Sequence, residues 1–85
     1  MLPILHKGAL VGRLDAKAHR SEAVFEVRAL YLENGVELDD GAVADLAQAL
    51  LTCALWHATP VVTITRSQPA TLRKRLLAAL QHRQN

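Results

Sequence analysis

Apolar and polar residues alternate along two neighbouring stretches near the start of the chain, residues 10–19 and 23–33. Such alternation is typical of strands that pack one face on a core and expose the other to water. Folding the chain back at Ser21-Glu22 brings the apolar positions together. The resulting pairs are Ala18 with Phe25, Ala16 with Val27, Leu14 with Ala29 and Gly12 with Tyr31. The pattern predicts an antiparallel hairpin with one defined register.

The charged residues of the same two stretches favour that register as well. It places Lys17 opposite Glu26, and Asp15 opposite Arg28. Opposite charges across an antiparallel pair stabilise it modestly, by about 0.2–1 kcal/mol for each pair. Two separate patterns, one apolar and one electrostatic, therefore indicate the same pairing.

Residues 1–6 predict a further short strand ahead of this hairpin. Lys7-Gly8 is a plausible two-residue turn, because glycine tolerates positive φ. Folding there sets Leu5 against Leu10 and Ile4 against Val11. Pro3 cannot donate to a strand ladder, so we expect this first strand at the edge of a three-strand meander.

After a turn at Asn34-Gly35, helical spacing begins near Asp39, whose carboxylate can cap the free N–H groups of the first turn. Leu38 would pack on Val43 as a hydrophobic staple. Thr59-Pro60 ends this helix, because a residue before proline disfavours the α region. Its expected apolar stripe is Val43, Leu46, Ala47, Leu50, Leu51, Ala54 and Leu55.

The β-branched run at residues 61–65 predicts a strand. Ser67 or Gln68 then caps a last helix, with Pro69 near its first turn. The expected core face of that helix is Leu72, Leu76, Leu77 and Leu80.

The predicted order βββαβα describes a single domain over residues 1–85. It belongs to the α+β class, with two helices packed on one face of a mostly antiparallel sheet. Such a sheet could also curl towards a barrel.

The composition fits a small cytoplasmic domain that does not enter a membrane. The chain has 85 residues, of which 51% are hydrophobic. No apolar run approaches the roughly 20 residues that span a bilayer, and the first residues lack the basic start and long apolar core of a signal peptide. Cys53 is the single cysteine, so no intrachain disulfide can form, in keeping with a reducing compartment.

Charge is distributed unevenly although the net charge is only +2. All eight acidic residues lie between Asp15 and Asp45. The residues after Asp45 include five basic ones: Arg66, Arg73, Lys74, Arg75 and Arg83. One interpretation is a basic patch that faces phosphates. The other, which we favour, is a solvated helix face whose arginines pair with the acidic half of the chain.

The usual signatures of catalysis and metal binding are missing, so we expect no catalytic residues, no metal and no cofactor in this chain. Cys53 and His57 share a helix face, yet a zinc site needs further ligands. Cys53 lies mid-helix rather than at a helix N-terminus, so nothing evident activates its thiol as a nucleophile. Asp15 and Glu26 each face a cation, which favours ordinary ionised carboxylates. Glycines are isolated, so no phosphate-binding loop is present.

Two segments resemble the C-terminal region of the winged-helix DNA glycosylases, the YcaQ/AlkZ-like enzymes that remove alkylated bases and unhook interstrand crosslinks. One is the Gly-Arg-x-Asp-x-Lys-x-x-Arg pattern of residues 12–20, together with residues 25–33. The other is Leu-Trp-His-Ala-Thr-Pro at residues 55–60. The resemblance covers nearly the whole chain.

The resemblance implies a terminal β-rich domain of a several-fold longer repair enzyme. In that family, tandem winged helices upstream carry the DNA cleft and a Gln-x-Asp or Gln-x-Gln catalytic motif. Neither motif occurs here, because Gln48 is followed by Ala-Leu and Gln81 by His-Arg. The start of the chain within its first strand agrees with an excised or truncated domain. Its expected partners are the winged-helix domains and, weakly, the backbone of duplex DNA.

The candidate DNA contacts form two sets of basic residues. They are Arg13, Lys17 and Arg20 along one strand face, and Arg66, Arg73 and Lys74 near the last helix. Such contacts give salt-dependent affinity without reading sequence. We expect Trp56 to pack on the sheet rather than to stack on bases. The alternative function is an interaction module that pairs through its exposed first strand with a partner or, as a homodimer, with itself.

Overall fold

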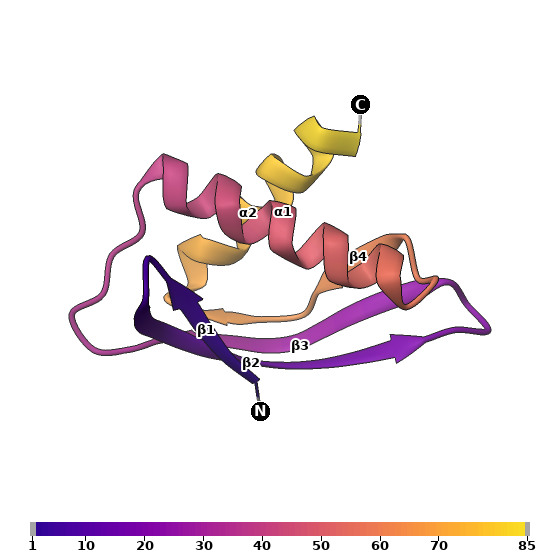
Figure 1. The fold of residues 1–85 in the computed structure, drawn as a ribbon, viewed down its shortest axis with the longest axis horizontal. Helices are drawn as coiled ribbons and strands as arrows, with labels where there is room; N and C mark the ends of the chain where they lie inside the picture. The colour runs from indigo at the N-terminus through magenta and orange to yellow at the C-terminus, as the bar shows by residue number, and fades with distance from the viewer. Residues whose placement is uncertain (1, 85) are drawn as a thin grey trace.

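The computed structural model describes residues 2–84, and its elements follow the order βββαββα (Figure 1). Met1, with which the predicted first strand begins, lies outside the described residues. The elements are β1 (Leu2–His6), β2 (Ala9–His19), β3 (Val24–Leu32), α1 (Asp40–Trp56), β4 (Val61–Ile64), β5 (Ser67–Gln68) and α2 (Ala70–Gln84). The α+β class is confirmed, and β5 is a strand that the sequence did not predict.

The strands form one open sheet in the order β1-β2-β3-β4, and β5 also pairs with β3. The first three strands are antiparallel, whereas β4 and β5 run parallel to β3. Helix α1 connects β3 to β4, and both helices lie on the same side of the sheet (Figure 1). Among the described strands β1 pairs only with β2, and β4 only with β3. The sheet therefore has two edges, and the expectation that it curls into a barrel is wrong.

Both hairpin turns contain residues with a positive φ angle. At the β1–β2 turn Lys7 has φ 52° and Gly8 has φ 80°, as a two-residue turn between twisted strands requires. This prediction is confirmed. Between β2 and β3 the chain turns over residues 20–23, where the Glu22 N–H bonds the carbonyl of His19 and Ala23 has φ 61°.

The predicted register of β2 and β3 is correct at one end and wrong at the other. Ala18 faces Phe25, Lys17 faces Glu26 and Ala16 faces Val27, as expected. Between Asp15 and Ala16 the register shifts by one residue. From there Asp15 faces Ala29, Leu14 faces Leu30, Arg13 faces Tyr31 and Gly12 faces Leu32. The expected pairing of Asp15 with Arg28 is therefore absent.

A β-bulge at Arg28 accounts for this shift, because one extra residue on β3 reverses which side chains face the core. Val27 and Leu30 are both fully buried although they are three residues apart. Strict alternation would have pointed Leu30 into water and Tyr31 into the core. Burying Leu30 together with Val27 stabilises the fold more than an uninterrupted β2–β3 ladder would. Each such side chain contributes about 1.5–3 kcal/mol when it is buried.

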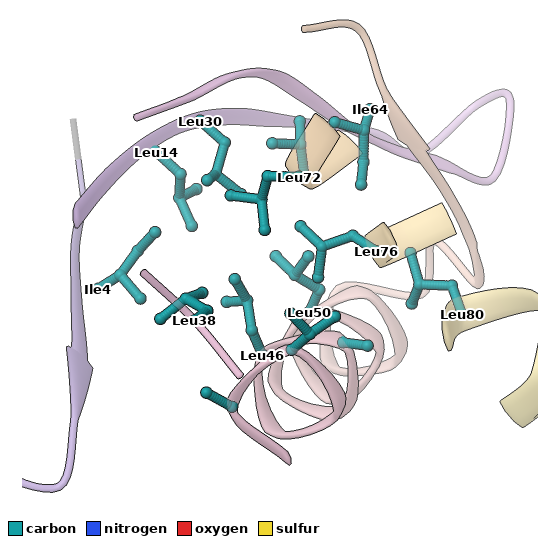
Figure 2. Packing of buried hydrophobic residues seen from close by; sticks show 14 of the residues in the cluster. Ile4, Leu14, Leu30, Leu38, Leu46, Leu50, Ile64, Leu72, Leu76 and Leu80 are labelled. Atoms are coloured by element: carbon teal, nitrogen blue, oxygen red, sulfur yellow. The ribbon is translucent and has the colours of Figure 1, made fainter. Parts of the chain in front are cut away.

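A second irregularity lies between β1 and β2. Leu5 faces Leu10, as predicted, but Ile4 faces Gly12 rather than Val11. The register shifts between Ile4 and Leu5, so the predicted pairing of Ile4 with Val11 is wrong. The shift directs Ile4 into the core, where it is buried beside Leu14 (Figure 2).

Helix α1 begins where the sequence predicted. The Oδ1 atom of Asp39 accepts a hydrogen bond of 2.7 Å from the N–H of Ala42. At the other end Ala58 has φ 58°, and the N–H and Oγ1 of Thr59 both donate to the carbonyl of Ala54, at 2.9 and 3.0 Å. The predicted stripe is confirmed for most of its members, but Leu55 is exposed.

The segment before α2 differs from its expected role as a simple helix cap. Ser67 and Gln68 form β5, which pairs in parallel with Leu30 and Tyr31 of β3. The Ser67 hydroxyl still accepts a hydrogen bond of 2.9 Å from the N–H of Arg73 in the first turn of α2. Ser67 therefore caps the helix from within a strand.

The core fills the space between the sheet and the two helices, as Figure 2 shows for its larger side chains. Sheet residues meet helix residues there in a single cluster. Its labelled members are Ile4, Leu14, Leu30, Leu38, Leu46, Leu50, Ile64, Leu72, Leu76 and Leu80. Because both helices cover one face, the other face of the sheet carries the polar half of each strand.

Candidate nucleic-acid interface

The face of the sheet opposite the helices, here called the outer face, gathers basic side chains from several strands. Leu14 and Val27 point into the core, so their neighbours along the strands point outwards. Arg13 and Lys17 extend from β2, and Arg28 from β3; all three are exposed. Arg66, in the link between β4 and β5, is exposed as well.

The carboxylate of Glu26 is the centre of a polar network on this face. Its Oε1 accepts a hydrogen bond of 2.8 Å from His19 Nε2 and lies 3.6 Å from Arg28 Nε. Its Oε2 accepts a hydrogen bond of 3.2 Å from the hydroxyl of Thr65, just after β4. Lys17 faces Glu26 in the register but makes no ion pair or hydrogen bond among the described residues. The network links β2, β3 and the residue that follows β4, and it does not include Lys17.

These contacts lower the pKa of Glu26 from its ordinary value of 4.5. The hydrogen bond from His19 is the largest cause, and the Thr65 hydroxyl and the nearby charges of His19 and Arg28 act in the same direction. Partial desolvation opposes them and is outweighed. Glu26 is therefore an ionised structural carboxylate rather than a proton donor at neutral pH.

A row of three side chains crosses the outer face at the other end of the strands. Arg13 on β2 faces Tyr31 on β3, and Arg66 Nη2 donates a hydrogen bond of 3.2 Å to the Tyr31 hydroxyl. Arg13 Nε also lies 3.4 Å from Glu33 Oε1. The row therefore holds a half-buried phenol ring between two guanidinium groups.

The structure divides the six predicted DNA contacts among three places. Arg13, Lys17 and Arg66 share the outer face, whereas Arg20 lies in the exposed β2–β3 turn. The remaining two, Arg73 and Lys74, belong to α2 in the helix layer. There Arg73 Nε donates a hydrogen bond of 2.6 Å to the carbonyl of Ile64, while the Lys74 side chain is exposed.

One arginine of the basic C-terminal segment pairs with the acidic half of the chain, as one interpretation of the charge distribution expected. Arg75 Nη2 lies 3.0 Å from Asp40 Oδ1, and its Nη1 donates to the Leu38 carbonyl at 2.8 Å. The side chain of Arg83 lies outside the described part of the chain.

Sequence reasoning placed Arg28 on the polar face but not among the candidate DNA contacts, and it missed Tyr31 as a member of the outer face. Tyr31 was assigned to the apolar face because it continues the alternation of Phe25 and Val27. The signal that could have revealed the change is the run Ala-Leu-Tyr-Leu at residues 29–32, where two leucines compete with that alternation. A bulge resolves the competition in favour of the leucines.

The expectation that Trp56 packs on the sheet is wrong, because its side chain is 85% exposed at the end of α1. The next residue, His57, makes the aromatic contact with the sheet instead. Its ring stacks on Phe25 with centroids 6.2 Å apart. Leu55 and Val61, close to Trp56 in the chain, are exposed hydrophobic residues as well.

An apolar groove of about 230 Å³ lies between β1 and α1. Leu2, Leu5 and Ala49 are on its walls, and Cys53 contributes a half-buried thiol. His6 Nδ1 and Asp45 Oδ2, 4.0 Å apart, are its ion-pairing groups. The part of the chain that the structure describes contains no group of three or more His, Cys, Asp or Glu side chains that could hold a metal ion.

No protein-family model matches this chain, and no solved structure matches it. Within residues 2–84, neither helix combines the length and the apolar character that crossing a lipid bilayer requires.

Proposed function

We propose that this domain contacts the phosphate backbone of DNA through its outer face. The single observation that carries the proposal is the gathering of Arg13, Lys17, Arg28 and Arg66 on a sheet face that no helix covers. Phosphate contacts need cations at the surface rather than a specific motif. Asp15 and Glu26 on these strands and Glu33 just after β3 are acidic, so the affinity of the isolated domain is expected to be weak.

The resemblance in residues 12–20, 25–33 and 55–60 supports extending this proposal to a larger protein. In the proposal, the chain is the non-catalytic C-terminal domain of a cytoplasmic winged-helix DNA glycosylase. The enzyme would hydrolyse the N-glycosidic bond of an alkylated or crosslinked base with residues upstream of this domain. The role of this domain would be to support the winged helices and to hold the backbone of the DNA.

The test is the affinity for a fluorescently labelled duplex, measured by anisotropy over a range of salt concentrations. If all four outer-face cations meet phosphates, the logarithm of the affinity falls with the logarithm of the salt concentration with a slope of about −3.6. Lys17→Gln should weaken binding and make that slope shallower by about 1. No binding at low salt would refute backbone contact by the isolated domain.

Lys74→Gln is a matched control for Lys17→Gln. Both lysines are exposed, and neither makes an ion pair or hydrogen bond among the described residues, so neither substitution should disturb the fold. They differ in that Lys17 lies on the outer face and Lys74 on α2. Equal loss of affinity in the two variants would show non-specific attraction to the whole molecule rather than an interface on the sheet.

The edge of β1 supports a second candidate function, a module that pairs its first strand with another strand. β1 is an edge strand of the sheet, and its Leu2 and Leu5 are 57% and 66% exposed. It carries no Asp, Glu, Lys or Arg that would repel a partner strand. A second copy could pair there in antiparallel fashion to form a homodimer. Leu5→Lys should then convert a dimer to a monomer in sedimentation equilibrium, and a wild-type monomer at high concentration would refute the dimer.

A further inference from the structure

We propose that Tyr31 is a stacking platform for an unpaired base, so that the outer face binds a single strand more tightly than a duplex. The proposal rests on the backbone contact proposed above and specifies the form of nucleic acid that this face prefers. Aromatic rings on an exposed sheet, flanked by cations, are a common way to hold single strands.

The bulge at Arg28 is what brings Tyr31 to this face. Without the extra residue, Tyr31 would face Gly12 and point towards the helices. With it, Leu30 is fully buried and Tyr31 lies opposite Arg13 instead. Bulges are frequent where a strand must redirect a side chain for function. The shift therefore places an aromatic ring among the outer-face cations.

The ring is hydrogen-bonded on one side and has an arginine at the facing strand position on the other. Arg66 donates a hydrogen bond of 3.2 Å to the Tyr31 hydroxyl, and Arg13 occupies the facing position on β2. Glu33 restrains Arg13 in turn, at 3.4 Å. On the β5 side the position beside Tyr31 is Gln68, which can pair with a base edge but does not cover the ring with an apolar side chain. A base lying on Tyr31 would leave its phosphates within reach of guanidinium groups on either side.

Stacking on Tyr31 requires a base whose own face is free. In a duplex the faces of the bases are already stacked on their neighbours. The row of Arg13, Tyr31 and Arg66 could then contact only phosphates. A single strand offers both phosphates and open base faces. We therefore expect the wild-type chain to bind an oligothymidylate at least fivefold more tightly than a duplex of the same length at the same salt concentration.

Trp56 is the most exposed large hydrophobic residue in the described part of the chain and is the natural comparison with the half-buried Tyr31. Its exposed neighbours along the chain are the apolar residues Leu55 and Val61, and no outer-face cation contacts it. Tyr31, in contrast, shares its row with two arginines. Charge complementarity to a polyanion therefore favours Tyr31 over Trp56 as the stacking residue.

The experiment uses the full chain, a fluorescein-labelled dT15 oligonucleotide and a labelled 15-base-pair duplex, with anisotropy read at low salt. Tyr31→Leu removes the ring, Tyr31→Phe keeps it without the hydroxyl, and Trp56→Leu is the control at the other aromatic site. Tyr31→Leu should weaken binding to dT15 about tenfold and leave duplex binding unchanged. Tyr31→Phe and Trp56→Leu should each stay within about twofold of the wild type. Far-UV circular dichroism checks that every variant is folded.

The outcomes separate this inference from the proposal on which it rests. If Tyr31→Leu has no effect on dT15, or if the wild type prefers the duplex, the stacking platform is refuted. Backbone contact would still stand in that case, provided that binding remains salt-dependent and sensitive to Lys17→Gln. If the wild type binds neither nucleic acid at low salt, both proposals are refuted.

Discussion

Gly12 lies where β2 passes close to the backbone of β3, and replacing it with alanine tests the packing of the sheet. A Cβ atom on Gly12 would overlap the carbonyl oxygen of Tyr31 and lie 3.2 Å from the Cα of Leu32. Both neighbours are backbone atoms, which cannot rotate away as the end of a flexible side chain could. Relief requires β2 and β3 to separate at this point, where Gly12 faces Leu32.

The expected cost follows from two opposing effects. Forcing an extra methyl group into a packed site costs about 1–3 kcal/mol, and the backbone overlap places Gly12→Ala near the upper limit. Alanine also restricts the unfolded chain more than glycine, which returns about 0.4–1 kcal/mol. The net loss of unfolding free energy should be about 2 kcal/mol. For a domain of this size that corresponds to a fall in Tm of roughly 8–16 °C.

Gly41→Ala is the matched control, since it adds the same methyl group elsewhere. The nearest atom to a Cβ on Gly41 is Asp39 Oδ1 at 3.5 Å, an ordinary contact, and the position is helical. Alanine favours helices over glycine by up to about 1 kcal/mol, so Tm should rise. Thermal unfolding of both variants is followed by far-UV circular dichroism. A Gly12→Ala variant as stable as the wild type would refute the close approach of the two strands.

Three further substitutions test other parts of the fold. Thr59→Val keeps the shape of a fully buried side chain but loses its hydrogen bond to the Ala54 carbonyl, so urea unfolding should show a loss of about 1 kcal/mol; an unchanged midpoint would contradict that role. Asp39→Ala removes the cap of α1 and should also cost about 1 kcal/mol at an unchanged m value, whereas Asp39→Asn should cost much less. The pKa of Glu26 is lowered in the folded state, so its ionised form stabilises the fold above pH 4.5 and this contribution is lost as the pH falls through the folded pKa. The difference in unfolding free energy between wild type and Glu26→Gln should therefore be larger at pH 7 than at pH 3, and an equal difference would refute the His19–Glu26 contact.

Features set by neighbouring residues could be predicted from the sequence. The Lys7-Gly8 turn depends only on local backbone angles, and the Asp39 cap on atoms three residues apart. The apolar stripe of α1 follows from helical periodicity in the same way. These elements needed no knowledge of the rest of the molecule.

The two register shifts and β5 could not be predicted, because they depend on which distant residues meet. The bulge at Arg28 is favoured only once Leu30 has helices to pack against. β5 is two residues long and exists through its parallel pairing with β3, which local propensity does not reveal. The candidate site was therefore only partly predicted: Arg13, Lys17 and Arg66 were among the expected contacts, but the position of Tyr31 depends on the bulge.

Trp56 illustrates a different kind of error. The helical stripe through Leu46, Leu50 and Ala54 does not include position 56, which lies on another side of α1. The expectation that Trp56 packs on the sheet disregarded this phase, and the indole is exposed to water. Periodicity was the better guide at this position.

The exposure of Trp56 also determines how this protein can be observed in solution. It is the single tryptophan of the chain, and its indole is already in water in the native state. Its fluorescence emission should therefore change little when the domain unfolds, and a flat fluorescence trace would not mean that the protein is stable. The same property makes Trp56 an intrinsic label for assembly that needs no added dye. Any protein domain that covers this end of α1 would shift the emission to shorter wavelengths.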